Sequence, residues 1–219
     1  MNNTLIDNSI EALSMTATLR KCLDIDGIQT VSIATGYWDI PGLAILQKSL
    51  RSFIEKDGTT LRLLIGKDPY IYANQLKSPK YKDSNYPLDF IKTDIHELNV
   101  TEEYKDAIRL LLDYCSKSND SKIQIRVFRK NANDETQFLH SKCYIFDGKQ
   151  NGIGIGIVGS TNFTQKGLQG NAELNYIETA PNQVLSLDAI PGNKSHLLWF
   201  NEKWEISEPW NEQFLEQVL

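Results

Sequence analysis

The chain has 219 residues, of which 41% are hydrophobic and 23% are charged, an ordinary composition for a globular protein with a sizeable core. It has no apolar run near the roughly 20 residues of a membrane helix, and its N-terminus lacks the pattern of a signal peptide. The three cysteines (Cys22, Cys115 and Cys143) fit no disulfide or zinc spacing, so we expect small buried side chains and a cytoplasmic location.

The net charge of −5 is unevenly distributed along the chain. Residues 119–170 contain seven basic and four acidic residues, whereas residues 171–219 contain two basic and eight acidic residues. A net negative chain argues mildly against nonspecific nucleic-acid binding, which depends on lysine and arginine. The central positive region is compatible with an anionic ligand there, or with chance clustering of surface charge.

The first third of the chain predicts a strand–helix–strand unit. Apolar residues at helical spacing predict a first helix within residues 5–25. Residues 28–38 are rich in β-branched side chains and predict a strand, residues 41–58 an amphipathic helix, and residues 59–66 a second strand. This order implies two parallel strands joined by a right-handed crossover.

The middle of the chain is less regular. Residues 67–88 are rich in tyrosine, lysine and proline, and we expect a long loop whose tyrosines either lie on the surface or stack on bases. Residues 89–118 predict one or two helices, with Thr101 as an N-cap. Residues 122–130 alternate cleanly between apolar and polar side chains, which predicts a strand with a basic face.

Three further strands are expected in close succession at residues 138–148, 152–160 and 173–179, followed by an aromatic helical segment at residues 195–219. The expected fold class is therefore α/β, with a mixed β-sheet flanked by helices. We expect one domain over residues 1–219, either the whole protein or the N-terminal domain of a longer one.

Charged residues interrupt the strand at 138–148, whose sequence is FLHSKCYIFDG. His140 and Lys142 are two residues apart and so share one face of an extended strand, and Asp147 follows. A half-buried strand with a solvated face is one explanation, and a phosphate-binding site is the other.

More polar residues follow at the ends of the next two strands. Ser160 and Asn162 lie two residues apart after a run of alternating glycines, and Glu173 begins the following strand. If the three strands are neighbours, their ends present an imidazole, a cation, two neutral donors and a carboxylate at one edge of the sheet. Phosphoryl transfer requires such groups, because fixed donors must meet the charge that develops on the phosphate oxygens.

Two short motifs connect these residues to a known family. HSKCYIFD matches the pattern His-x-Lys-x4-Asp, and GSTN matches the Gly-Ser-x-Asn that follows it. The sequence resembles the phospholipase D superfamily, and more narrowly the nuclease branch found in restriction endonucleases and at the N-termini of some bacterial helicases. The resemblance is strongest over residues 122–179.

The resemblance implies a role for each matching residue. His140 would be the nucleophile that forms a phosphohistidine intermediate, and Lys142 and Asn162 would bind the phosphate oxygens with Ser160 beside them. Glu173 would hydrogen-bond a catalytic histidine, while Asp147 would have a structural or second-shell role. Catalysis in the family needs no metal, so we expect neither a metal nor another cofactor.

This chain departs from the family pattern because it carries a single copy of the motif. His96 and His196 have no lysine two residues later and are expected to be structural. The family uses two histidines, one to attack and one to protonate the leaving oxygen. We therefore expect a two-fold homodimer in which two His140 side chains meet.

Other features are interpreted from the residues alone. Lys122, Arg126 and Lys130 share one face of their strand and are candidates for contacting nucleic-acid backbone. The glycines of GIGIGIV fit no nucleotide fingerprint and indicate close strand packing. The aromatic residues of the last segment are expected to form a packing face (Trp199, Phe200, Trp204 and Trp210).

These observations together predict a metal-independent nuclease that acts on DNA or RNA as a homodimer, with any sequence specificity supplied by a downstream helicase or specificity domain. One alternative is a phospholipid-acting enzyme, although the sequence lacks an amphipathic membrane-facing helix with basic flanks. The other is a non-cleaving DNA-binding or regulatory domain of a restriction or helicase system. The intact His140 and Glu173 argue against it, since phosphate binding alone needs no nucleophile.

Overall fold

The computed structural model describes residues 5–66, 101–116, 121–128, 139–188 and 192–217. The strands within these ranges belong to one sheet. They are β1 (Leu5–Asp7), β2 (Thr30–Thr35), β3 (Thr60–Ile65), β4 (Ile123–Val127), β5 (Cys143–Gly148), β6 (Ile153–Gly159), β7 (Leu174–Glu178) and β8 (Glu208–Pro209).

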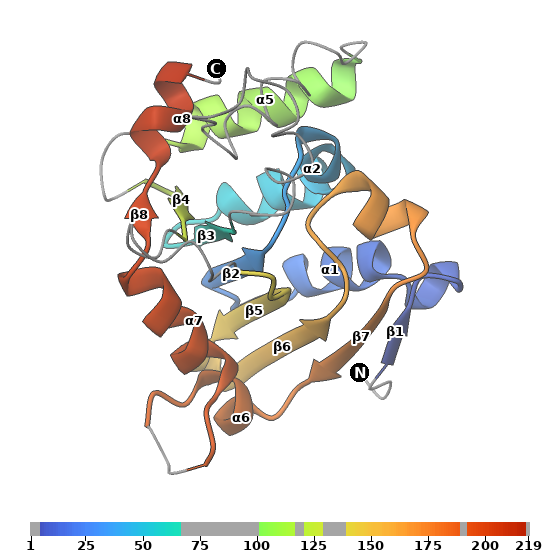
Figure 1. Ribbon diagram of the computed structural model, residues 1–219, viewed down its shortest axis with the longest axis vertical. Coiled ribbons are helices and arrows are strands. Elements are labelled where there is room, and N and C mark those ends of the chain that lie inside the picture. The colour runs from blue at the N-terminus through green and yellow to red at the C-terminus, as the bar shows by residue number, and fades with distance from the viewer. Residues whose placement is uncertain (1–4, 67–100, 117–120, 129–138, 189–191, 218–219) are drawn as a thin grey trace, which may run out of the picture.

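The sheet is mixed, as the sequence predicts, with the strand order β1-β7-β6-β5-β2-β3-β4-β8 (Figure 1). Strands β2, β3 and β4 are parallel to one another, and every other neighbouring pair is antiparallel. The three expected strands β5, β6 and β7 are consecutive neighbours, which places the ends of the motif-bearing segments together.

The helices include the crossover that the sequence predicts between β2 and β3. Asp39 caps this helix by accepting a hydrogen bond from the Gly42 backbone, and Pro41 lies in its first turn. The described helices are α1 (Met15–Leu23), α2 (Ile40–Ile54), α5 (Glu102–Tyr114), α6 (Pro181–Leu185), α7 (His196–Glu205) and α8 (Asn211–Gln217), with single turns η1 (Glu11–Leu13), η3 (Lys149–Asn151) and η4 (Lys166–Gly170).

Helices cover both faces of the sheet around β5 (Figure 1). Tyr144 and Phe146 point into the larger core, which α1, α2, α5 and α8 close, whereas Cys143 and Ile145 point into a smaller core under α6 and α7. Burial of both faces of β5 argues against the alternative explanation of a half-buried strand with a solvated face. Strand β5 begins at Cys143, and His140 and Lys142 lie in the extended segment just before it.

Two short edge strands were not predicted, and both lie in segments expected to be helical. Residues 5–25 divide into β1, η1 and α1, because Ser14 caps α1 at the Ala17 backbone and the chain before it pairs with β7. The final segment divides into α7, β8 and α8, with Pro209 pairing at the edge of β4. Proline lacks an amide donor and suits an edge strand.

Some expectations lie outside the described residues. They are the tyrosine-rich loop at 67–88, the part of the predicted helical segment at 89–100, His96 and Lys130. Among the described residues, none of the helices has the length and apolar character needed to cross a membrane. All three cysteines are buried and unpaired, as expected.

The alternating glycines of β6 allow two helices to pack closely on the sheet, which confirms their expected role. A β-carbon at Gly154 would lie 2.8 Å from the Leu185 side chain of α6, and one at Gly156 would lie 2.8 Å from the His196 ring of α7. Of the four aromatic residues predicted to pack, three are at most 5% exposed (Phe200, Trp204 and Trp210). The fourth, Trp199, is partly buried.

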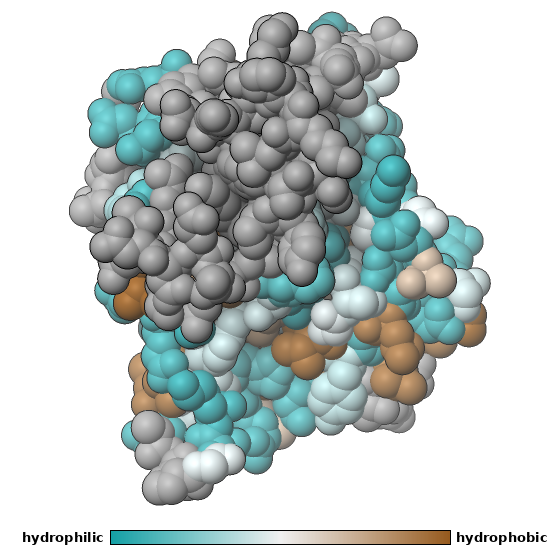
Figure 2. Space-filling model, in the orientation of Figure 1, coloured by the Kyte–Doolittle hydropathy of each residue, from teal (hydrophilic) through white to brown (hydrophobic). Residues whose placement is uncertain are grey.

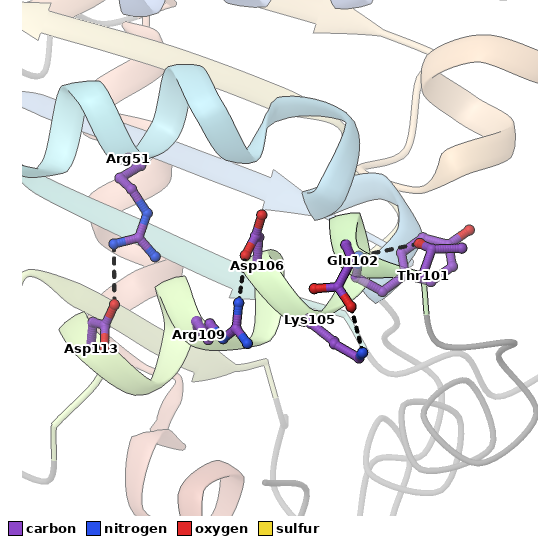
Figure 3. A network of polar contacts seen from close by, with 8 residues as sticks. Arg51, Thr101, Glu102, Lys105, Asp106, Arg109 and Asp113 are labelled. Atoms are coloured by element: carbon purple, nitrogen blue, oxygen red, sulfur yellow. Dashed lines mark hydrogen bonds and ion pairs between the residues drawn. The ribbon is translucent and has the colours of Figure 1, made fainter.

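Several ion pairs lie on the surface of α2 and α5, which pack side by side (Figure 3). Arg51 of α2 contacts Asp113 of α5 at 3.1 Å, and the other pairs in the figure are local to α5. Solvent-exposed pairs of this kind contribute at most about 1 kcal/mol each, so the buried helix faces account for most of the stability of this packing.

Candidate functional site

Three antiparallel strands bring the predicted site residues to one edge of the sheet. Cys143 at the start of β5 pairs with Val158 near the end of β6, and Gly159 at the end of β6 pairs with Asn175 near the start of β7. The segments that leave the sheet at this edge carry His140, Lys142, Ser160, Asn162 and Glu173.

His140 and Lys142 are held in contact by the backbone that joins them. The Lys142 ammonium donates a hydrogen bond of 2.7 Å to the His140 carbonyl oxygen, although its residue is only 8% exposed. The His140 side chain is exposed, and its ring meets Tyr37 edge-on with the ring centroids 6.4 Å apart. A cation this buried is costly unless it is hydrogen-bonded, so its position is well defined.

The loop after β6 is anchored at Thr161, the variable position of the Gly-Ser-x-Asn motif. The Asn175 side chain accepts a 3.2 Å hydrogen bond from the Thr161 amide and donates a 2.8 Å bond to its hydroxyl. The Tyr144 hydroxyl donates to the Thr161 carbonyl at 2.8 Å. Thr161 and Asn175 are nearly inaccessible to solvent, so this network fixes the residues on either side of Thr161.

The same loop fixes the side-chain amide of Asn162. Its Oδ1 accepts a 3.2 Å hydrogen bond from the Tyr37 backbone amide and lies 3.4 Å from the Thr35 hydroxyl. The Thr35 hydroxyl also accepts a 3.0 Å bond from the Phe163 amide and donates to the Tyr37 carbonyl. Since the Tyr37 backbone N–H can only donate, the Asn162 atom that faces it must be the oxygen Oδ1. The Nδ2 group of Asn162 is therefore the part that can donate to a ligand.

Glu173 is hydrogen-bonded to the motif serine. The Ser160 hydroxyl donates to one carboxylate oxygen, Asn171 donates to the other at 3.1 Å, and the Leu174 amide donates to the Ser160 oxygen at 3.1 Å. Burial and the nearby Glu173 carboxylate together raise the pKa of the Tyr144 hydroxyl well above its usual value. The strand pairing places Glu173, which directly precedes β7, at the same edge of the sheet as the segment bearing His140 and Lys142.

Comparison with known families identifies this arrangement. The family model described as "Cardiolipin synthase, PLD-like domain" matches residues 27–190, well over half of the chain. The chain belongs to the phospholipase D-like family. The matched region contains both motifs and Glu173, and it confirms the superfamily that the sequence resembles.

No curated protein matches the sequence. Among solved structures, NucT from Helicobacter pylori is 15% identical and covers 94% of this chain and 97% of its own, with a TM-score of 0.47. Nuc from Salmonella typhimurium, a phospholipase D family member, is 14% identical and covers 94% and 95%, with a TM-score of 0.49. Polyphosphate kinase from Porphyromonas gingivalis is 10% identical and covers 80% of this chain and 20% of its own, with a TM-score of 0.39. These likenesses are too low to support a statement about function.

The phospholipase D-like domain does not bring every candidate residue to this edge. Asp147 lies near the far end of β5, where its carboxylate accepts a hydrogen bond from the Lys149 amide at 2.8 Å. It stabilises the turn after β5, so the structure supports the structural half of its expected role and not a second-shell one.

Two of the basic residues expected to contact nucleic acid also have other partners. The Lys122 ammonium donates to the carbonyls of Ile54 and Lys56 at the opposite edge of the sheet. The Arg126 guanidinium donates to the Trp204 carbonyl at 2.8 Å and lies over the Trp204 ring. Because both cations serve intramolecular contacts, neither is included in the site, and their contact with nucleic acid stays a prediction.

Several residues that shape the site were missed from the sequence. Thr35 and Tyr37 position Asn162, Asn175 anchors Thr161, and Asp39 accepts a 2.9 Å hydrogen bond from the Gln165 amide. Thr35 is the last residue of β2 and Tyr37 follows it, so both lie at the carboxyl end of a strand, which is where ligand-binding residues of open α/β sheets gather. That rule was the available signal for them, whereas Asn175 gives none.

Proposed function

We propose that this phospholipase D-like domain is a nuclease that cleaves phosphodiester bonds of nucleic acid through a phosphohistidine intermediate, without a metal ion. The observation that carries the proposal is the convergence of an exposed histidine, a buried lysine and an oriented asparagine at one edge of the sheet. Such a set supplies both a nucleophile and fixed donors for phosphate oxygens.

In the first step, a neutral imidazole nitrogen of His140 attacks phosphorus. A nitrogen–phosphorus bond forms as the bond to the leaving oxygen breaks, and that oxygen takes up a proton. Lys142 and the Asn162 amide donate to the nonbridging oxygens, and Ser160 lies beside them. Because the Lys142 ammonium is hydrogen-bonded to the His140 backbone, the cation is already positioned beside the nucleophile when the phosphate binds.

In the second step, water attacks the phosphohistidine, releases the phosphate product and restores the free imidazole. An acid is needed in the first step and a base in the second, and we propose that His140 of the partner subunit serves as both. Glu173 would hold a histidine in the required tautomer while it accepts from Ser160.

An apolar surface beside the site supports the dimer. It consists of four exposed side chains on the sheet face that α7 leaves uncovered, which we call the β6–β7–β1 surface (Leu5, Val158, Leu174 and Tyr176, 36–57% exposed). Tyr176 pairs with both Leu5 and Val158 across the strands, and Leu174 directly follows Glu173. Figure 2 shows apolar side chains on this part of the face.

The first experiment measures cleavage of single- and double-stranded DNA and RNA in excess EDTA, with wild type and His140→Ala side by side. We expect cleavage that survives chelation and disappears in the variant. Lys122→Met, at the opposite edge of the sheet, is the matched control and should cleave like wild type. Loss of cleavage in EDTA, or its survival in His140→Ala, would refute the proposed chemistry.

A mixing experiment tests the shared site. Wild type and His140→Ala are unfolded together and refolded at several ratios, so that the dimers contain random pairs of subunits. If both histidines are needed, activity follows the square of the wild-type fraction. A linear dependence would show that each chain acts alone.

The same preparation addresses the rival substrate classes. Because the family model names a phospholipid enzyme, vesicles of an anionic phospholipid are included as a second substrate. Turnover of lipid and not of nucleic acid would overturn the nuclease proposal. Binding of DNA by wild type and His140→Ala alike, with no cleavage of any substrate, would indicate a binding or regulatory domain.

A further inference from the structure

A pocket of about 410 Å³ opens beside the proposed phosphate site, between the edge of the sheet and the start of α7. Lys142 and Val158 form its wall on the sheet side, and Lys194, His196 and Trp199 form its wall on the α7 side. Its volume lies within the roughly 300–1,000 Å³ typical of small-molecule sites. Lys142 also belongs to the proposed phosphate site and Val158 to the β6–β7–β1 surface, but none of the roles proposed above places a ligand in this space.

Close packing at β6 sets the position of this pocket. The His196 ring lies against Gly156, where any β-carbon would be within 3 Å of the ring, so α7 approaches the strand closely. At Val158, two residues further, the helix no longer covers the strand, and the side chain is 36% exposed. The pocket therefore begins where the helix leaves the sheet, directly beside the edge that carries the site.

The pocket shares Lys142 with the proposed phosphate site, and this limits the ligands that it can bind. A phosphate bound by Lys142 has its ester substituent within reach of the pocket, and in nucleic acid that substituent is a nucleoside. A second phosphate is disfavoured, because the Lys194 ammonium is already paired with Glu202 at 2.5 Å. The partly buried Trp199 and the apolar Val158 also line the pocket, and these two side chains suit a planar aromatic group.

We propose that this pocket holds one unpaired nucleobase next to the scissile phosphate, stacked on Trp199, and that the substrate is therefore single-stranded nucleic acid. This inference rests on the nuclease function proposed above. A base in a duplex would have to leave its stack and its partner to enter the pocket, which costs free energy that a single strand does not pay.

The test measures binding separately from cleavage. His140→Ala is used as the background so that the oligonucleotide remains intact, and binding of a labelled single strand is compared with binding of its duplex by fluorescence anisotropy. We expect tighter binding of the single strand. Trp199→Ala should weaken single-strand binding about 5- to 160-fold, the range expected for one stacked base, and should leave duplex binding unchanged.

Two further variants keep the inference falsifiable if Trp199→Ala does not fold. Trp199→Phe retains an aromatic ring and should bind single strands within about threefold of the background protein, given that any aromatic face can stack. Val158→Phe fills the pocket and should weaken single-strand binding selectively. Because Val158 also belongs to the β6–β7–β1 surface, analytical ultracentrifugation checks that this variant keeps the association state of the background protein. Equal losses for single strand and duplex, or no loss in either Trp199→Ala or Val158→Phe, would overturn the inference.

The outcomes distinguish this inference from the function on which it rests. Cleavage in EDTA with no preference for single strands, and no effect of Trp199→Ala, leaves the nuclease standing and removes the base pocket. Selective, Trp199-dependent binding of single strands without cleavage by wild type supports the pocket and removes the nuclease.

Discussion

Replacing Thr35 with valine tests the internal support of Asn162. The side chain is fully buried, and its hydroxyl donates a 2.6 Å hydrogen bond to the Tyr37 carbonyl and accepts a 3.0 Å bond from the buried Phe163 amide. Valine has the same shape but leaves both backbone groups without this partner. Leaving a buried amide unpaired costs about 1–3 kcal/mol, and the lost bond to the carbonyl adds about 0.5–1.5 kcal/mol. We expect a loss of about 1.5–4.5 kcal/mol in the free energy of unfolding.

Urea unfolding followed by circular dichroism measures this loss, and Thr35→Ser is the matched control. Serine keeps the hydroxyl and removes one buried methyl group, which should cost about 1 kcal/mol. Under the proposed function, Thr35→Val should also cleave nucleic acid more slowly than Thr35→Ser at equal folded concentration, since Asn162 loses part of its support. A loss below about 1 kcal/mol for valine, or a larger loss for serine, would refute the reasoning.

Three further predictions follow from other contacts. Burial raises the pKa of Asp39 above its usual 3.8, so the stability that the protonated carboxyl contributes is complete below that pH and is lost as the pH rises through the folded-state pKa. Asp39→Asn keeps the cap on Gly42 and should gain stability relative to wild type as the pH rises from 3.8 through that folded-state pKa. Gly159→Ala would place a β-carbon 2.5 Å from the Leu174 carbonyl oxygen and should cost about 1–3 kcal/mol in urea unfolding. Leu174→Asp should raise the dimer dissociation constant about 100-fold in analytical ultracentrifugation, because the leucine is buried twice in a two-fold dimer.

Each of these predictions has a result that contradicts it. A stability difference between Asp39→Asn and wild type that does not change with pH would show that Asp39 does not titrate with folding. Unchanged stability of Gly159→Ala would mean that β6 and β7 adjust without cost. Leu187→Asp is the control for the dimer, since Leu187 is 52% exposed and follows α6, away from the β6–β7–β1 surface. Equal effects of Leu174→Asp and Leu187→Asp would exclude that surface as the interface.

Local patterns were sufficient to predict the centre of the fold. The strand β2, the helix α2 with Asp39 and Pro41 at its start, and the strand β3 follow from periodicity and capping residues that act over a few positions. The succession of β5, β6 and β7 is predicted for the same reason, and strands that follow one another along the chain are commonly neighbours in the sheet.

Features that depend on distant contacts were not predictable. The strands β1 and β8 have three and two residues, too few to show a period, and each exists because a partner strand lies beside it. The network of Thr35, Tyr37 and Asn162 joins residues more than 120 positions apart. The intramolecular partners of Lys122 and Arg126 were not predictable either, because the sequence does not show the carbonyl groups to which these cations donate.

The turn after β5 is a suitable point at which to attach a label or a tether to this protein. His140 precedes β5, whereas η3 and Gly152 follow it, so the six residues of the strand, about 20 Å in length, separate them. A β-carbon at Gly152 would meet open space, although its φ of +69° favours glycine itself. A short tether attached beside Gly152 would therefore fix the protein to a surface by the end of the sheet farthest from His140, so that the proposed site faces the solution.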